Sequence, residues 1–216
     1  MTATWKFRLL VLFIFVFVGG ISAANLAAEV LRPAASPLPL KGNETLLPDQ
    51  ISSLSLASSI APFRSDIGGD YAVALAGQAL SGQSTEGRTA EEAIRDAFRI
   101  GAHDSRLWLV LALLQSRGDA SDRPAESLKM SYLTGPNRAE IIPPRLQTVT
   151  LGNALTDSDL AELARGDVRA MLSQLPEQRP ALVNDYGRAS ALGKKFLEES
   201  VKTFDPGFVE KLRGGS

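Results

Sequence analysis

The feature that most constrains this chain is an uncharged apolar run near its start, from Leu9 to Ala28. A helix rises about 1.5 Å per residue, so about 20 residues are enough to cross the hydrocarbon core of a bilayer. Lys6 and Arg8 precede the run, and basic residues beside a span stay on the cytoplasmic side. We therefore expect residues 1–32 to be a membrane segment, with the remainder on the outer side of a bacterial inner membrane.

Two interpretations of this segment remain open. The small residues at 22–24, Ser-Ala-Ala, fit the cleavage site of a signal peptide. Leu26, Val30 and Leu31 carry the apolar stretch past that site, which favours an uncleaved single-pass anchor with a periplasmic C-terminal part. The alternative is a leader that is removed, with release of the protein into the periplasm.

Composition excludes several classes of function. The 216 residues carry 23 basic and 24 acidic side chains, a formal net charge of -1, whereas a nucleic-acid binder needs a basic excess to neutralise phosphates. With 0 Cys and a single histidine, His103, the chain lacks the ligands of a zinc site. We expect no nucleic-acid partner, no metal and no cofactor.

The rest of the chain divides into a linker and a helical domain. Prolines break any helix across residues 33–48, which we interpret as a Pro-rich linker. Residues 49–216 show helical spacing and little two-residue alternation, so the predicted fold class is all-α. The expected helices in its first part are 48–60, 70–79 with Asp70 as cap, 90–100 opened by a Thr89–Glu92 capping box, 105–116 capped by Asp104, and one from Asp122 to Gly135.

Part of this domain resembles a known repeat family. Trp108, Leu111 and Ala112 show the spacing that opens a tetratricopeptide repeat, and Pro136 lies where such a unit closes. The family's period of about 34 residues carries this pattern back into the helix at 70–79. Residues 70–136 thus resemble nearly two tetratricopeptide units, and the resemblance implies antiparallel helical hairpins that stack and bind a protein partner.

A second resemblance concerns the order of the segments. The anchor, the segment 106–114 (RLWLVLALL) and the segment 128–137 (LKMSYLTGPN) are together similar to small accessory proteins of bacterial exopolysaccharide and capsule clusters. This resemblance implies a role in surface polysaccharide synthesis or export. It assigns no catalytic residue.

The C-terminal part, residues 138–213, is expected to form capping helices. They are predicted at 138–151 with Pro143 and Pro144 in the first turn, at 156 onward, at 167–175, at 180–204, and after Pro206. The longest carries a seam of small and apolar residues with helical spacing. This seam either packs inside the chain as a cap or joins two copies in a homodimer, and the cap is favoured. It consists of Leu182, Tyr186, Ala189, Gly193, Phe196 and Ser200.

These patterns predict a membrane-anchored periplasmic scaffold or adaptor, not an enzyme. Stacked hairpins bind partners on the face of their first helices, where Arg106 and Gln115 are the candidate partner contacts. No motif places a nucleophile beside a base, so no catalytic residue is assigned. The alternatives are a glycan-acting enzyme with two carboxylates about 5–10 Å apart, and a structural homodimer subunit of an envelope complex.

Overall fold

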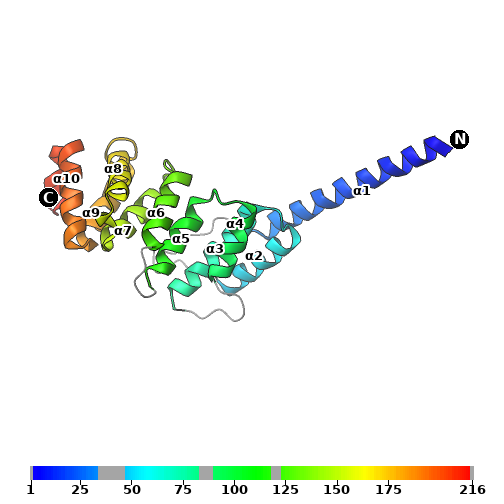
Figure 1. Cartoon of the computed structure of the whole chain (residues 1–216), viewed down its shortest axis with the longest axis horizontal. Coiled ribbons are helices and arrows are strands. Elements are labelled where there is room, and N and C mark those ends of the chain that lie inside the picture. Colours follow the sequence, from blue (N-terminus) through cyan, green and yellow to red (C-terminus); the bar gives the residue numbers. More distant parts are fainter. Residues whose placement is uncertain (1, 34–46, 83–89, 118–122, 215–216) are drawn as a thin grey trace. The chain divides into compact units, whose positions relative to one another are not determined.

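The computed structural model of the chain describes residues 2–33, 47–82, 90–117 and 123–214, and every regular element in these ranges is helical (Figure 1). The predicted all-α class is therefore confirmed. The chain divides into two compact units, Met1–Ala102 and His103–Ser216, and the boundary falls inside the predicted repeat region. Most of the predicted linker, Thr89 of the predicted capping box and the predicted cap Asp122 lie outside the described residues.

The described residues of the first unit contain four helices. The longest, α1, is continuous from the N-terminal end of the described chain to residue 31. The helix α2 has Pro48 in its first turn, where the missing N–H costs nothing, and the Gln50 side chain accepts a hydrogen bond from the Leu47 backbone N–H at 3.0 Å. The four helices are α1 (Thr2–Leu31), α2 (Pro48–Ile60), α3 (Ser65–Leu80) and α4 (Ala90–Ile100).

Asp70 does not begin a helix, contrary to the prediction. The helix α3 starts five residues earlier, at Ser65, and runs through Gly68 and Gly69. Glycine lowers helix propensity, but Gly69 is buried here, so packing overrides the local preference. Asp70 therefore lies in the second turn of α3 with only 3% of its surface exposed, and its carboxylate serves another purpose described below.

The helices α3 and α4 pack on each other through small side chains. Alanine recurs along the buried sides of both, so their backbones can approach closely. Gly77, at a position where a tetratricopeptide unit has a large apolar residue, is buried too. The buried alanines are Ala72, Ala74, Ala76, Ala90, Ala93 and Ala97.

The second unit begins with a further pair of packed helices, α5 (Ser105–Gln115) and α6 (Arg123–Thr134). Asp104 caps α5 as predicted, because its carboxylate accepts a hydrogen bond from the Arg106 backbone N–H at 3.0 Å. Each unit thus contains a pair of consecutive helices in contact, the local feature expected of helical hairpins. Membership in the tetratricopeptide family stays a prediction.

Five further helices and three short 3-10 turns follow in the described part of the second unit. The prediction of separate helices at 156 and 167 is wrong, because α8 runs unbroken from Ser158 to Ser173 with Asp167 in its interior. Asp157 caps it through the backbone N–H groups of Asp159 and Leu160. The elements are α7 (Ile142–Leu151), η1 (Ala154–Thr156), α8 (Ser158–Ser173), η2 (Pro176–Gln178), α9 (Arg179–Arg188), α10 (Ala191–Phe204), η3 (Pro206–Phe208) and α11 (Val209–Leu212).

The predicted long helix at 180–204 is two helices. The backbone is extended at Ala189, with φ -62° and ψ 149°, and Ser190 caps α10 by accepting from the Gly193 N–H at 3.1 Å. Five of the six seam residues, all except Tyr186, are buried within this single chain, and α9 and α10 pack on α7 and α8. The seam therefore packs inside the unit on α7 and α8, whereas its role as a cap over the repeat and the homodimer alternative stay predictions.

Candidate functional site

The helix α1 is long and apolar enough to cross a membrane. Its segment Trp5–Leu31 has a mean hydropathy of 2.4 over 18 residues, and none of that window is buried in the protein. Phe15, in the middle of the apolar run, is 77% exposed. Large apolar side chains all around a helix are typical of a membrane span, and a signal sequence has the same composition.

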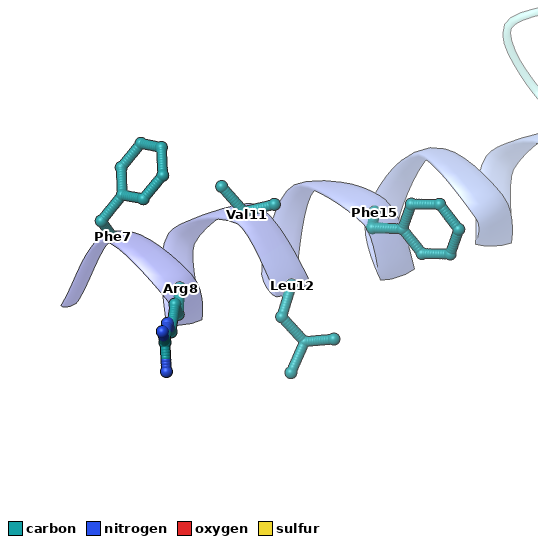
Figure 2. A pocket seen from close by; sticks show the side chains of 5 residues that line it. All are labelled: Phe7, Arg8, Val11, Leu12 and Phe15. Carbon is teal, nitrogen blue, oxygen red and sulfur yellow. The ribbon is translucent and has the colours of Figure 1, made fainter. Parts of the chain in front are cut away.

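A shallow hollow on α1 has the character of a lipid-facing surface. Figure 2 shows the five side chains that line it, Phe7, Arg8, Val11, Leu12 and Phe15, and all five come from this one helix. A site for a polar small molecule gathers polar groups that converge on the ligand. Arg8 is the one charged side chain among the five, so the hollow fits acyl chains better than a polar ligand.

The C-terminal end of α1 is part of the packed core of the first unit. Ala28 is fully buried in a cluster with Ala57 and Ala61 of the α2 end and Ile67 of α3. Leu31 and Ile60 pack against the same cluster. The alanines permit close approach of α1 and α2. The same helix α1 is thus exposed and apolar over most of its length and packed in the protein core at its end.

Ionic contacts join the same end of α1 to α3. The Arg32 guanidinium donates to the Asp70 carboxylate at 2.7 Å and to Asp66 at 3.0 Å, and it lies 3.6 Å from Glu29 one turn back. Asp70 is almost fully buried, and a buried carboxylate needs such a partner because desolvation of a lone charge is costly. Arg32 therefore holds α1 on α3.

A second arginine extends this junction. Arg64 lies between α2 and α3, 2.8 Å from the Glu29 carboxylate, and its side chain also hydrogen-bonds Asp66. The Arg64 hydrogen bonds lower the pKa of Asp66 to about 2, with a further contribution from the charge of Arg32. We call Glu29, Arg32, Arg64, Asp66 and Asp70 the junction network.

The junction network does not have the character of a glycosidase site. Asp66 and Asp70 meet at the same arginine, so they are a carboxylate pair to consider for the enzyme alternative. A general acid needs a raised pKa to hold its proton at neutral pH, whereas the pKa of Asp66 is lowered. This pair is suited to structural ion pairing.

Sequence reasoning missed the junction network. It assigned Asp70 to a helix cap and gave no role to Glu29 or Arg32. The available signal was the appearance of two charges of opposite sign directly after a long apolar run. The partner on α3, however, lies 38 residues further along the chain, and no local pattern connects the two.

The two predicted partner contacts lie on α5 but do not form one surface. Arg106 and Gln115 are nine positions apart on the helix, which is about 14 Å along the axis and half a rotation around it. Arg106 pairs with the cap Asp104 at 2.6 Å, and Gln115 accepts a hydrogen bond from Ser127 of α6 at 2.8 Å. Both side chains thus have contacts within the second unit, and their role toward a partner stays a prediction.

The second unit contains a buried charged cluster that the sequence did not indicate. Arg145 of α7 is fully buried and contacts both carboxylate oxygens of Asp167 on α8, at 2.7 and 3.0 Å. It also donates to the carbonyl of Gly135 at 3.0 Å, and its guanidinium stacks 3.8 Å from the Tyr132 ring. Burial raises the pKa of Asp167, and the hydrogen bonds from Arg145 oppose this increase. The cluster joins α6, α7 and α8 and is fully enclosed, so its role is structural.

Asp185 of α9 is a second buried acid. Burial raises its pKa to about 7, and the charge of Arg188 opposes that increase. Within the described residues its Oδ2 atom has no hydrogen-bond partner. The same described part of the chain contains no group of three or more His, Asp or Glu side chains placed to hold a metal ion.

Comparison of this chain with protein-family models, with curated proteins and with solved structures found no match. The candidate site is α1 and its junction network, on the evidence of the exposed apolar helix and its contacts with α2 and α3.

Proposed function

We propose that this chain is a single-pass protein of the bacterial inner membrane that holds a protein partner in the periplasm through its helical part. The observation that carries the proposal is the continuity of α1, which is exposed and apolar over most of its length and is joined to α2 and α3 at its end. The partner, in this proposal, belongs to a machine for surface polysaccharide synthesis or export.

The course of the helix supports an anchor rather than a cleaved leader. The candidate cleavage residues 22–24 lie inside α1, which continues to Leu31. Ala24 and Asn25 are already partly covered, and Ala28 is fully buried. Proteases cut extended, accessible segments, and this segment is helical and partly packed. Lys6 and Arg8 at the other end support a cytoplasmic N-terminus.

The adaptor role is supported by the helical architecture and by the resemblances in the sequence. Each unit contains consecutive helices in contact, and paired helices of this kind serve as partner-binding scaffolds in repeat proteins. The polysaccharide machine comes from the similarity of residues 106–114 and 128–137 to accessory proteins of such clusters. The chemistry that the junction network supports is attachment of helices, not turnover of a substrate.

The test of the anchor is the mass of the intact protein purified from native membranes. Retention of residues 1–24 supports the proposal. A chain that begins at residue 25 and is extracted without detergent contradicts it.

The test of the adaptor is capture of the full-length tagged chain from native membranes, with identification of the co-purified proteins by mass spectrometry. Recovery of glycosyltransferase, flippase or polysaccharide-export components supports the proposed machine. A specific partner of another class contradicts the polysaccharide link, and a preparation without any specific partner contradicts the adaptor role.

The predicted contacts are tested in the same experiment. Arg106→Ala and Gln115→Ala are prepared separately, because the two side chains lie on opposite sides of α5. Arg169→Ala, on the exposed surface of α8, is the control. If Arg106→Ala or Gln115→Ala loses the partner while the control keeps it, at unchanged helix content, that residue is supported as a partner contact. Capture at the control level with both variants contradicts the assignment.

A further inference from the structure

The most exposed large apolar side chain in the described residues is Phe63, at 91% exposure. It lies in the turn between α2 and α3, residues 61–64, which we call the corner. The neighbouring corner residue Ala61 is buried against α1, so the fold holds the corner in place while Phe63 points away from the protein. An aromatic side chain exposed to this degree is available for contact with lipid, because aromatic residues concentrate at membrane interfaces.

The height of the corner along α1 is given by its contacts. Ala28, the last residue of the apolar run, packs in one cluster with Ala57 and Ala61. Arg64, at the other side of the corner, contacts Glu29 at 2.8 Å. The corner therefore lies level with the end of the apolar run, where a helix of this length leaves the hydrocarbon core.

The direction of α3 shows which part of the first unit lies level with the end of the apolar run. Arg32, one turn beyond Glu29, contacts Asp66 and then Asp70 further along α3, so α3 leads away from the end of the span. The end of α4 returns to the start of α3, because a Cβ on Gly101 would lie 2.9 Å from Ser65 Cβ. Ile100, beside it, is 46% exposed.

We propose that the corner, through Phe63, inserts into the boundary between headgroups and acyl chains of the leaflet from which α1 emerges, with Ile100 as a second contact. This inference rests on the proposed role of α1 as a membrane anchor. Aromatic side chains concentrate at this boundary, and charged groups such as those of the junction network are tolerated there. The occupant of the apolar corner is lipid because the corner is continuous with the span itself.

The consequence is a fixed orientation of the first unit on the membrane. A single helix can rotate and tilt in a bilayer, and contacts at the interface restrict this freedom. Two attachments, the span and the corner, hold the unit against the surface. The junction network fixes the position of the corner relative to α1.

The absence of cysteine from the sequence allows a direct test. Single cysteines are introduced into the full chain, labelled with an environment-sensitive fluorophore, and reconstituted into phosphatidylethanolamine–phosphatidylglycerol vesicles with nitroxide-labelled acyl chains. Phe63→Cys is the test position. Val18→Cys, in the middle of α1, reports insertion of the span.

Two further positions are controls for the label. Leu56→Cys is another apolar and exposed site, 53% exposed, and it lies on α2 about 7.5 Å along the helix from the start of the corner. Glu91→Cys lies at the end of α4 remote from Gly101. Attraction of the fluorophore itself to lipid would affect these positions as much as the corner.

The expected result is blue-shifted emission and quenching at position 63, less than at position 18 and clearly more than at positions 56 and 91. Quenching at 18 but not at 63 overturns the inference and leaves the anchor intact. A blue-shifted label at 63 that nitroxide lipids do not quench means that protein, such as a second copy, covers the corner, and it overturns the lipid assignment. No quenching at 18 overturns the anchor, and the inference with it.

Discussion

The buried pair of Arg145 and Asp167 allows a strong prediction about stability. Replacing Arg145 by Met keeps an unbranched apolar side chain at this position but leaves the Asp167 carboxylate, 3% exposed, without its cation. Removal of one partner from a buried ion pair costs about 3–5 kcal/mol. We expect Arg145→Met to lower the free energy of unfolding of the second unit by this amount.

The double variant Arg145→Met/Asp167→Leu distinguishes the physical causes of that loss. It removes the buried charge together with its partner, so the large desolvation cost disappears. The carbonyl groups of Gly135 and Pro136 still lose their donor, which costs about 1–3 kcal/mol. The double variant should therefore be more stable than Arg145→Met alone, although it has lost more contacts.

The pH dependence of Arg145→Met provides a further check. Burial already raises the pKa of Asp167 in the native protein, and loss of Arg145 raises it further. A group whose folded pKa exceeds its unfolded value destabilises the fold as pH rises above the unfolded pKa, and the effect is absent where both states are protonated. The variant should lose less stability at pH 5 than at pH 8.

The assay is urea unfolding of the full chain in detergent, monitored by Trp108 fluorescence in a Trp5→Phe background so that the signal comes from the second unit. The control is Arg169→Met, because Arg169 is an exposed arginine of α8, and substitutions at such surface positions change stability by no more than about 0.5 kcal/mol. A loss below about 1 kcal/mol for Arg145→Met, or a double variant less stable than the single one, would refute this reasoning.

Two further changes have defined outcomes in the same assay. Gly193→Ala places a Cβ 2.2 Å from the Thr150 carbonyl oxygen and should lower the free energy of unfolding by about 1–3 kcal/mol. The Cβ of Gly187→Ala meets nothing within 4 Å, so this variant should stabilise α9 by about 0.5–1 kcal/mol. Equal effects of the two variants would show that the close approach of Gly193 to Thr150 is unimportant. Asp185→Asn removes a carboxyl whose pKa is about 7 in the fold and 3.8 when unfolded. The substitution therefore relieves the cost of ionising this buried group. That cost is absent below about pH 4, grows between pH 4 and 7, and stays constant above. We expect a gain of no more than about 4 kcal/mol at pH 8 and none at pH 4, and a gain that does not depend on pH would contradict this assignment.

Local sequence patterns predicted the individual helices well where the chemistry is local. Asp104 caps α5 because its carboxylate reaches an N–H two residues ahead, and Pro143 and Pro144 lie in the first turn of α7, where their missing N–H groups cost nothing. The errors at Asp70 and Asp167 share one cause. Asp70 and Asp167 resemble helix caps in the sequence, but each is a buried partner of an arginine, 38 and 22 residues away respectively.

In the candidate site, too, local sequence predicted one part and tertiary structure decided the other. The apolar run from Leu9 to Ala28 determines by its length and composition that a helix there can cross a membrane, because it carries no charge and most of its side chains favour lipid over water. Which residues join that helix to the rest of the unit was decided by tertiary structure alone. Arg32 finds Asp70, and Arg145 finds Asp167, only after separate helices pack and exclude water, because burial makes an unpaired charge too costly to retain.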